Sequence, residues 1–145
     1  MQFGIEITGD RRAADRLYKM GQKAVHAQPV LTRMGEKILQ LEKERFANGR
    51  FKPLAASTKA RKRRQGISRR PLHGATGDLE RSLTSRGGKN IFNVDSTQLT
   101  VGSRVRYSFY HQFGVGVPKR EPLKITPKQR KPLANLLLRY LKGED

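Results

Sequence analysis

Few residues in this sequence have types and spacings that would let them act together in chemistry. The three histidines, His26, His73 and His111, stand too far apart to form a local metal-binding motif, and the chain has no cysteine to supply a thiolate ligand or a disulfide. The stretch from His73 to Asp78, His-Gly-Ala-Thr-Gly-Asp, looks like a site because it brings an imidazole near a carboxylate. A turn followed by a helix N-cap explains the same residues equally well.

The motifs of common enzyme classes are missing as well. The chain has no glycine-rich phosphate loop, no Gly-x-Ser-x-Gly, no His-Glu-x-x-His and no carboxylate cluster suited to two metal ions. Asp78 and Glu80 fall in the first turn of a predicted helix, where the helix dipole alone favours them. His111, between Tyr110 and Gln112, is expected to be packed or hydrogen-bonded. The sequence therefore predicts a protein that is not an enzyme and that uses no metal, cofactor or small-molecule substrate.

Basic charge is the strongest compositional signal. The 145 residues include 31 Lys and Arg against 12 Asp and Glu, a formal net charge of +19. Residues 50–70 hold nine basic side chains and no acidic one: Arg50, Lys52, Lys59, Arg61, Lys62, Arg63, Arg64, Arg69 and Arg70. They could contact nucleic-acid phosphates without sequence preference, pair with carboxylates of a neighbouring subunit, or form only a solvated loop. A charge this large favours an acidic macromolecular partner.

The periodicity of the apolar residues predicts one α+β domain over residues 1–145, with N-terminal and C-terminal helices packed on a small antiparallel sheet. We expect a strand at 1–8, helices at about 11–27, 30–48 and from 78, a hairpin around 91–101, and a last helix from Thr126-Pro127. Residues 50–73 are expected to form a long, mobile basic loop, since like charges four residues apart resist helix formation. Glu42 is placed off the apolar side of its helix, and Phe109, Tyr110 and Phe113 are assigned to the core in preference to an interface.

The chain gives no sign of membrane insertion or export. Its longest apolar run is the three leucines at 136–138, far short of the roughly 20 residues that a membrane span needs. The first ten residues lack the basic start and apolar stretch of a secretory signal. We expect a protein that stays in the cytoplasm of its host during assembly.

Four blocks of residues then occur in a distinctive order. They are Arg-Phe-Lys-Pro-Leu-Ala-Ala-Ser-Thr at 50–58, Leu-His-Gly-Ala-Thr-Gly-Asp-Leu at 72–79 with Ser-Leu at 82–83, Tyr-Ser-Phe-Tyr-His-Gln-Phe-Gly at 107–114, and Pro-Lys-Arg-Glu-Pro-Leu at 118–123. Together, over residues 50–141, they resemble the virion morphogenesis or tail-completion family of tailed bacteriophages, which includes Mu-like and neck proteins. Residues 1–49 match only in helical character. Glu121-Pro122 departs from the family's usual Pro-Phe, and the basic loop is unusually rich.

The resemblance implies a structural virion protein of the phage neck that joins head to tail or completes the tail, as an oligomeric ring. Its partners would be further copies of itself, other neck, portal-side or tail subunits, and double-stranded DNA as a candidate contact of the basic loop. Damage to the assembly residues Tyr110, His111, Phe113, Gly114, Pro118 and Arg120 should then prevent particle formation. We expect a positive φ at Gly114 and an exposed Arg120 that pairs with a neighbour's carboxylate.

The alternative is a sequence-nonspecific nucleic-acid-binding protein of ribosomal or nucleoid type. Charge is the whole argument for that alternative, because such a module has no particular need of a His-Gln-Phe-Gly block followed by Pro-x-Arg.

Overall fold

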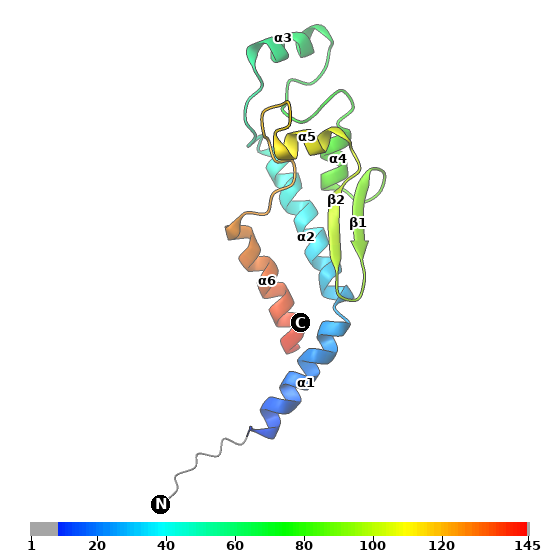
Figure 1. Cartoon of the computed structure of the whole chain (residues 1–145), viewed down its shortest axis with the longest axis vertical. Coiled ribbons are helices and arrows are strands. Elements are labelled where there is room, and N and C mark those ends of the chain that lie inside the picture. The colour runs from blue at the N-terminus through cyan, green and yellow to red at the C-terminus, as the bar shows by residue number, and fades with distance from the viewer. Residues whose placement is uncertain (1–8, 145) are drawn as a thin grey trace, which may run out of the picture.

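A computed structural model describes residues 9–144 and shows an elongated molecule built along one central helix (Figure 1). The described residues form six helices and one two-stranded antiparallel sheet, which confirms the predicted α+β class: α1 (Arg11–Val25), α2 (Gln28–Ala47), α3 (Ala56–Arg64), α4 (Asp78–Thr84), β1 (Asn90–Val94), β2 (Leu99–Ser103), α5 (Tyr107–Phe113) and α6 (Pro127–Lys142). The strand expected at 1–8 lies outside the described residues.

The central helix α2 follows the predicted apolar periodicity. Val30, Leu31, Leu39 and Phe46 are buried along it at helical spacing. Pro29 stands in the first turn, where backbone N–H groups have no partner within the helix. Its lack of an N–H therefore costs no hydrogen bond at the start of α2. It ends at Ala47, before Asn48-Gly49, as expected.

The hairpin packs against α2 and reaches back to the start of that helix. β1 and β2 pair from Asn90 with Ser103 to Val94 with Leu99. Ser96 at the hairpin tip accepts a hydrogen bond from the backbone N–H of Ala27, 2.8 Å away, at the junction of α1 and α2. The hairpin turn expected between the predicted strands is confirmed.

Two apolar clusters lie along α2. One gathers around Ala27, Val30 and Leu31 and includes side chains of the hairpin and of α6. The other joins the far end of α2 to the segment that carries α4, through buried residues that are distant in sequence: Phe46, Leu72, Leu79, Leu83 and Val105. The second cluster fixes both ends of residues 50–73, because Phe51 packs against it from one side and Leu72 belongs to it.

The N-caps expected for α6 and α4 form in different ways. Thr126 caps α6 as expected, in a capping box with Gln129, and the helix continues through Pro132 without a new start there. The N-cap expected within residues 73–78 is Gly77, in a left-handed conformation (φ 70°) and without a side-chain cap bond. The buried leucines expected in α4 are confirmed.

Candidate assembly site

The basic residues 50–70 lie at one end of the molecule, around α3 (Figure 1). The expectation of a continuous loop is wrong here, since residues 56–64 form a helix. The reason is positional: Arg61, Lys62, Arg63 and Arg64 fall in the last turn, where the negative end of the helix dipole stabilises cations and offsets their repulsion. The mobility of residues 50–73 stays a prediction.

Two of the nine basic side chains hold this segment in place. The Nζ of Lys62 donates to the carbonyls of Ser68 (3.2 Å) and Arg70 (3.3 Å), which closes the chain after α3. The guanidinium of Arg70 donates to the Phe46 carbonyl at the end of α2 and to the Glu80 carboxylate, at 3.0 and 3.1 Å. The other basic residues of the run are exposed: Arg50, Lys52, Lys59, Arg61, Arg63, Arg64 and Arg69.

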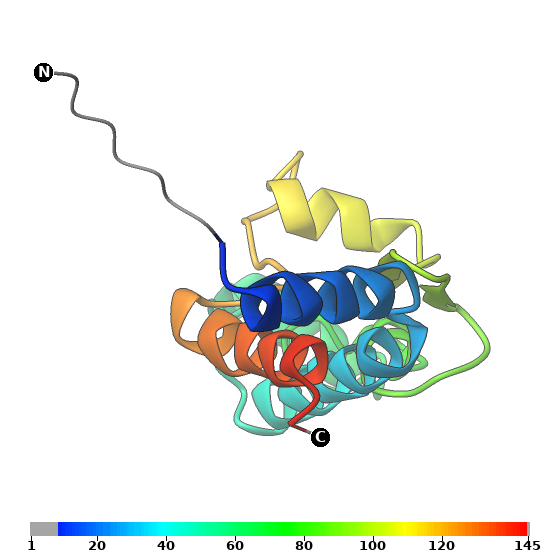
Figure 2. The same ribbon diagram turned by 90° about the horizontal axis from the view of Figure 1, so that it is seen from below.

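The aromatic residues of α5 face solvent, so their assignment to the core was wrong. Phe109, Tyr110 and Phe113 are 55%, 49% and 63% exposed, and Phe109 contacts both other rings. Figure 2 shows α5 standing apart from the layer of α1, α2 and α6. The partly buried positions of α5 are polar instead: Ser108, His111 and Gln112. We call the exposed group Phe109, Tyr110, Phe113 and Val115 the α5 face.

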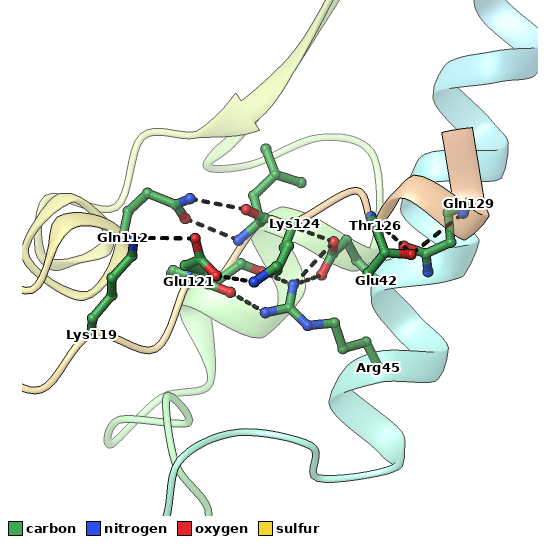
Figure 3. Close-up of polar contacts among 10 residues, drawn as sticks. Glu42, Arg45, Gln112, Lys119, Glu121, Lys124, Thr126 and Gln129 are labelled. Atoms are coloured by element: carbon green, nitrogen blue, oxygen red, sulfur yellow. Dashed lines mark hydrogen bonds and ion pairs between the residues drawn. The ribbon is translucent and has the colours of Figure 1, made fainter. Parts of the chain in front are cut away.

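Gln112, which sequence reasoning left without a role, fastens α5 to the chain that follows. Its side-chain amide donates to the Leu123 carbonyl (3.0 Å) and accepts from the Leu123 N–H (3.2 Å), as Figure 3 shows. Between them the chain turns at Gly114, whose φ of 75° confirms the predicted positive value. Pro118 is exposed within this turn-back.

Arg120 is buried, contrary to the exposed position expected for it. Only 8% of its surface is accessible, and its guanidinium donates to the carbonyls of Lys52 (2.8 Å) and Pro53 (3.0 Å). Its backbone N–H donates to the His111 carbonyl at 2.9 Å. Arg120 therefore connects α5 to the beginning of the basic segment and helps to hold the fold.

His111 lies half-buried beside this connection. Burial lowers the pKa of its imidazole, and the nearby positive charges of Arg120 and Lys62 lower it further. An imidazole held neutral among cations fits the packed role that the sequence indicated.

A buried ion pair sits where the central helix meets the segment after Arg120. Glu42 is 1% exposed and accepts from Arg45 (2.9 Å) and from the backbone N–H of Lys124 (3.0 Å). Arg45 also donates to the carbonyls of Glu121 and Pro122, as Figure 3 shows in part. Burial raises the pKa of Glu42, against the opposing effects of Lys124 and Arg45. Sequence reasoning placed Glu42 off the apolar side and missed this link.

The first helix has an apolar side that nothing in the described chain covers. Leu17 and Tyr18 are each 69% exposed and Val25 is 51% exposed. The opposite side of α1 meets α6, where the Nζ of Lys23 donates to the Tyr140 carbonyl at 3.0 Å. We call Leu17, Tyr18 and Val25 the α1 face.

Within the part of the chain that the structure describes, no hydrogen bond joins His73 to Asp78. His73 and Asp78 have separate partners: the Asp78 carboxylate accepts from Arg81 (2.6 Å) and Lys89 (2.5 Å). Within residues 9–144, no three His, Asp or Glu side chains are grouped to hold a metal ion. Among the helices of that same range, none has the length and apolar character needed to cross a membrane.

Comparison with known proteins agrees with the resemblance carried by the four blocks. The model of the phage virion morphogenesis family matches residues 8–142, almost the whole chain. No curated protein and no solved structure matches this chain. The match covers the basic segment, the α5 block and the α6 helix in one stretch, and the chain therefore belongs to the phage virion morphogenesis family.

Proposed function

We propose that this protein is a non-enzymatic structural subunit of the phage neck, which joins head to tail or completes the tail as a ring of identical copies. The observation that carries the proposal is the presence of two separate exposed apolar surfaces, the α1 face and the α5 face. Small soluble proteins rarely leave such groups of large apolar side chains in water unless another surface covers them.

Two different faces on one chain favour contacts of the head-to-tail kind. When the α1 face of one copy meets the α5 face of the next, the same contact repeats from copy to copy and closes into a ring where the rotation allows. A symmetric dimer would need only one self-complementary face. The faces lie on different parts of the molecule, α1 at one end and α5 toward the other (Figure 1).

The charge of the chain supports assembly with acidic partners as well. A net charge of +19 makes copies repel one another at low salt, so a ring gains stability from neighbours that bring carboxylates or phosphates. The partners proposed to bring such negative charge are the neck, portal-side and tail subunits, and double-stranded DNA.

The ring arrangement is tested by mixing two variants. Leu17→Ser with Tyr18→Ser removes the α1 face, and Phe109→Ser with Phe113→Ser removes the α5 face. Each variant should stay monomeric in analytical ultracentrifugation, whereas the mixture should form heterodimers through the one intact pair of faces and go no further. Self-association of the α5 variant alone would show a symmetric α1 contact and contradict the head-to-tail arrangement.

Leu138→Ser is the matched control for these variants. Leu138 is an exposed leucine of α6 (47%) outside both faces, so its replacement should leave association unchanged. Thermal melts of all variants should stay close to that of the unaltered chain, because exposed apolar side chains contribute little to monomer stability.

The neck role is tested by complementation. A phage that lacks this protein is supplied with each variant, and the particles are examined by electron microscopy. Variants of either face should give separate heads and tails, and the Leu138→Ser control should give complete particles. Complete, infectious particles from both face variants would overturn the proposed role.

A second candidate function is sequence-indifferent contact with double-stranded DNA. It rests on the outer side of α3, where Lys59, Arg63 and Arg64 are exposed and no carboxylate is present between residues 50 and 70. Such side chains bind phosphates through charge and counterion release. The two functions are compatible, because the exposed cations of α3 belong to neither apolar face.

A further inference from the structure

A cavity of about 660 Å³ lies beneath α3. It is bordered by the chain leading into α3, by the inner side of that helix, and by the segment that returns after α5, and it is partly open to solvent. Leu54, Leu72, Val117 and Pro118 give it an apolar lining, and Tyr107 borders it from α5. Its volume falls in the range of about 300–1,000 Å³ that is usual for ligand pockets.

The same cavity is bordered by cations and by no carboxylate. Arg61 and Lys62 reach it from α3, and Arg120 from the returning segment. None of the three is ion-paired with a carboxylate within residues 9–144. Arg120 and Lys62 are held in place by backbone carbonyls, which are dipoles and do not neutralise a full charge.

The repulsion among these cations is visible at Lys62. Burial lowers the pKa of its amino group, and the charges of Arg120 and Arg61 lower it further. A bound anion would relieve this repulsion and would gain from an environment less polar than water.

We propose that this cavity binds a segment of a neighbouring protein in which an aspartate or glutamate stands beside a large apolar side chain. The carboxylate meets Arg61, Lys62 and Arg120, and the apolar side chain fills the space lined by Leu54, Leu72 and Val117. Carboxylates make their strongest hydrogen bonds with such charged donors, and arginine can bind both carboxylate oxygens at once.

The concave, apolar shape favours a peptide over DNA as the occupant. Duplex phosphates are contacted by side chains that extend from exposed surfaces, and such side chains lie on the outer side of α3. An apolar pocket gives nothing to a phosphate, but it suits an anchoring side chain of a protein partner. The proposed site does not rest on the head-to-tail ring. Peptide binding is measured on the purified chain, so it can succeed or fail whether or not a ring forms.

The probe is a short rhodamine-labelled peptide with the central sequence Asp-Leu-Phe-Asp, and binding to the full chain is followed by fluorescence anisotropy. Two matched peptides replace both aspartates by asparagine, or Leu-Phe by Gly-Gly, and each should bind at least about tenfold more weakly. Equal binding of the asparagine peptide would overturn the proposal. The proposal would also be overturned if a short DNA duplex displaced the peptide and bound a variant with a filled cavity, Thr58→Trp, as well as it bound the unaltered chain.

Two variants on the inner side of α3 and one on its outer side locate the site. Arg61→Glu should weaken binding of the Asp-Leu-Phe-Asp peptide by about 10- to 100-fold, the loss of one or two charge-assisted hydrogen bonds. Arg63→Glu, with the same change in net charge on the opposite side of the helix, should weaken it by less than about threefold. Thr58→Trp fills the cavity without changing charge and should abolish binding. Equal losses for Arg61→Glu and Arg63→Glu, or full binding by Thr58→Trp, would place the peptide elsewhere.

Discussion

Replacing Arg120 by alanine should destabilise the subunit strongly. The guanidinium makes two hydrogen bonds, to the Lys52 and Pro53 carbonyls, and hydrogen bonds from a charged group are worth about 1.5–3 kcal/mol each. Lys52 and Pro53 are exposed, so water can partly replace the lost donors, and the repulsion between Arg120 and Lys62 is removed as well. We therefore expect the lower part of that range, a total loss of about 3 kcal/mol.

A loss of that size is measured by thermal and urea unfolding. For a chain of this length it corresponds to a fall in Tm of about 10 °C. Lys119→Ala is the matched control: Lys119 is the adjacent cation, is exposed, and makes a surface ion pair with Glu121 at 3.3 Å, worth about 0–1 kcal/mol. A fall of less than about 2 °C for Arg120→Ala, equal to that of the control, would refute the reasoning.

Two further measurements separate the hydrogen bonds of Arg120 from its charge. Arg120→Lys keeps the charge but loses the planar fork that reaches both carbonyls, so it should lose about half of the stability lost by alanine. Trypsin should also cut residues 50–64 faster in Arg120→Ala than in the unaltered chain, since the anchor at Lys52 and Pro53 is gone. Unchanged cleavage would mean that Arg120 does not hold the basic segment.

Three other predictions follow from single contacts. Gly114→Val should lower the free energy of unfolding by about 1–3 kcal/mol, because φ is 75° and a Cβ would lie 3.0 Å from the Lys119 Cβ. A urea midpoint equal to that of the unaltered chain would contradict this prediction. Hydrogen bonds from Lys89 and Arg81 lower the pKa of Asp78 to about 2, below its unfolded value, so its contribution to stability is present above about pH 4 and is lost as the pH falls toward 2. The difference in urea midpoint between Asp78→Asn and the unaltered chain should therefore be largest near neutral pH and vanish near pH 2, whereas a constant difference would exclude this origin. If DNA contacts the basic segment through the outer side of α3, log K against log[salt] should slope by about −5 to −7. Replacing Lys59, Arg63 and Arg64 by glutamine should flatten that slope by about 3 units, and an unchanged slope would refute the contact.

Local sequence rules were sufficient for much of the fold. Apolar spacing located α2, and Thr126-Pro127 and Asn48-Gly49 gave helix boundaries that depend on neighbouring backbone groups alone. The positive φ of Gly114 was also readable, because the chain had to turn after a dense aromatic stretch. The ordered blocks of residues identified the family without any knowledge of their contacts.

The tertiary structure alone decided which side chains are buried, since burial depends on partners distant in sequence. Arg120 looked exposed between two prolines, but it is buried by carbonyls that lie far before it in the chain. Glu42 looked like a surface residue of α2 until the returning segment brought Lys124 over it. The rings of α5 looked like core by composition, but α5 turns polar Gln112 inward because the Leu123 backbone there needs a partner. Sequence pattern determined local geometry and family, and long-range packing determined which residues hold the fold and which remain free for partners.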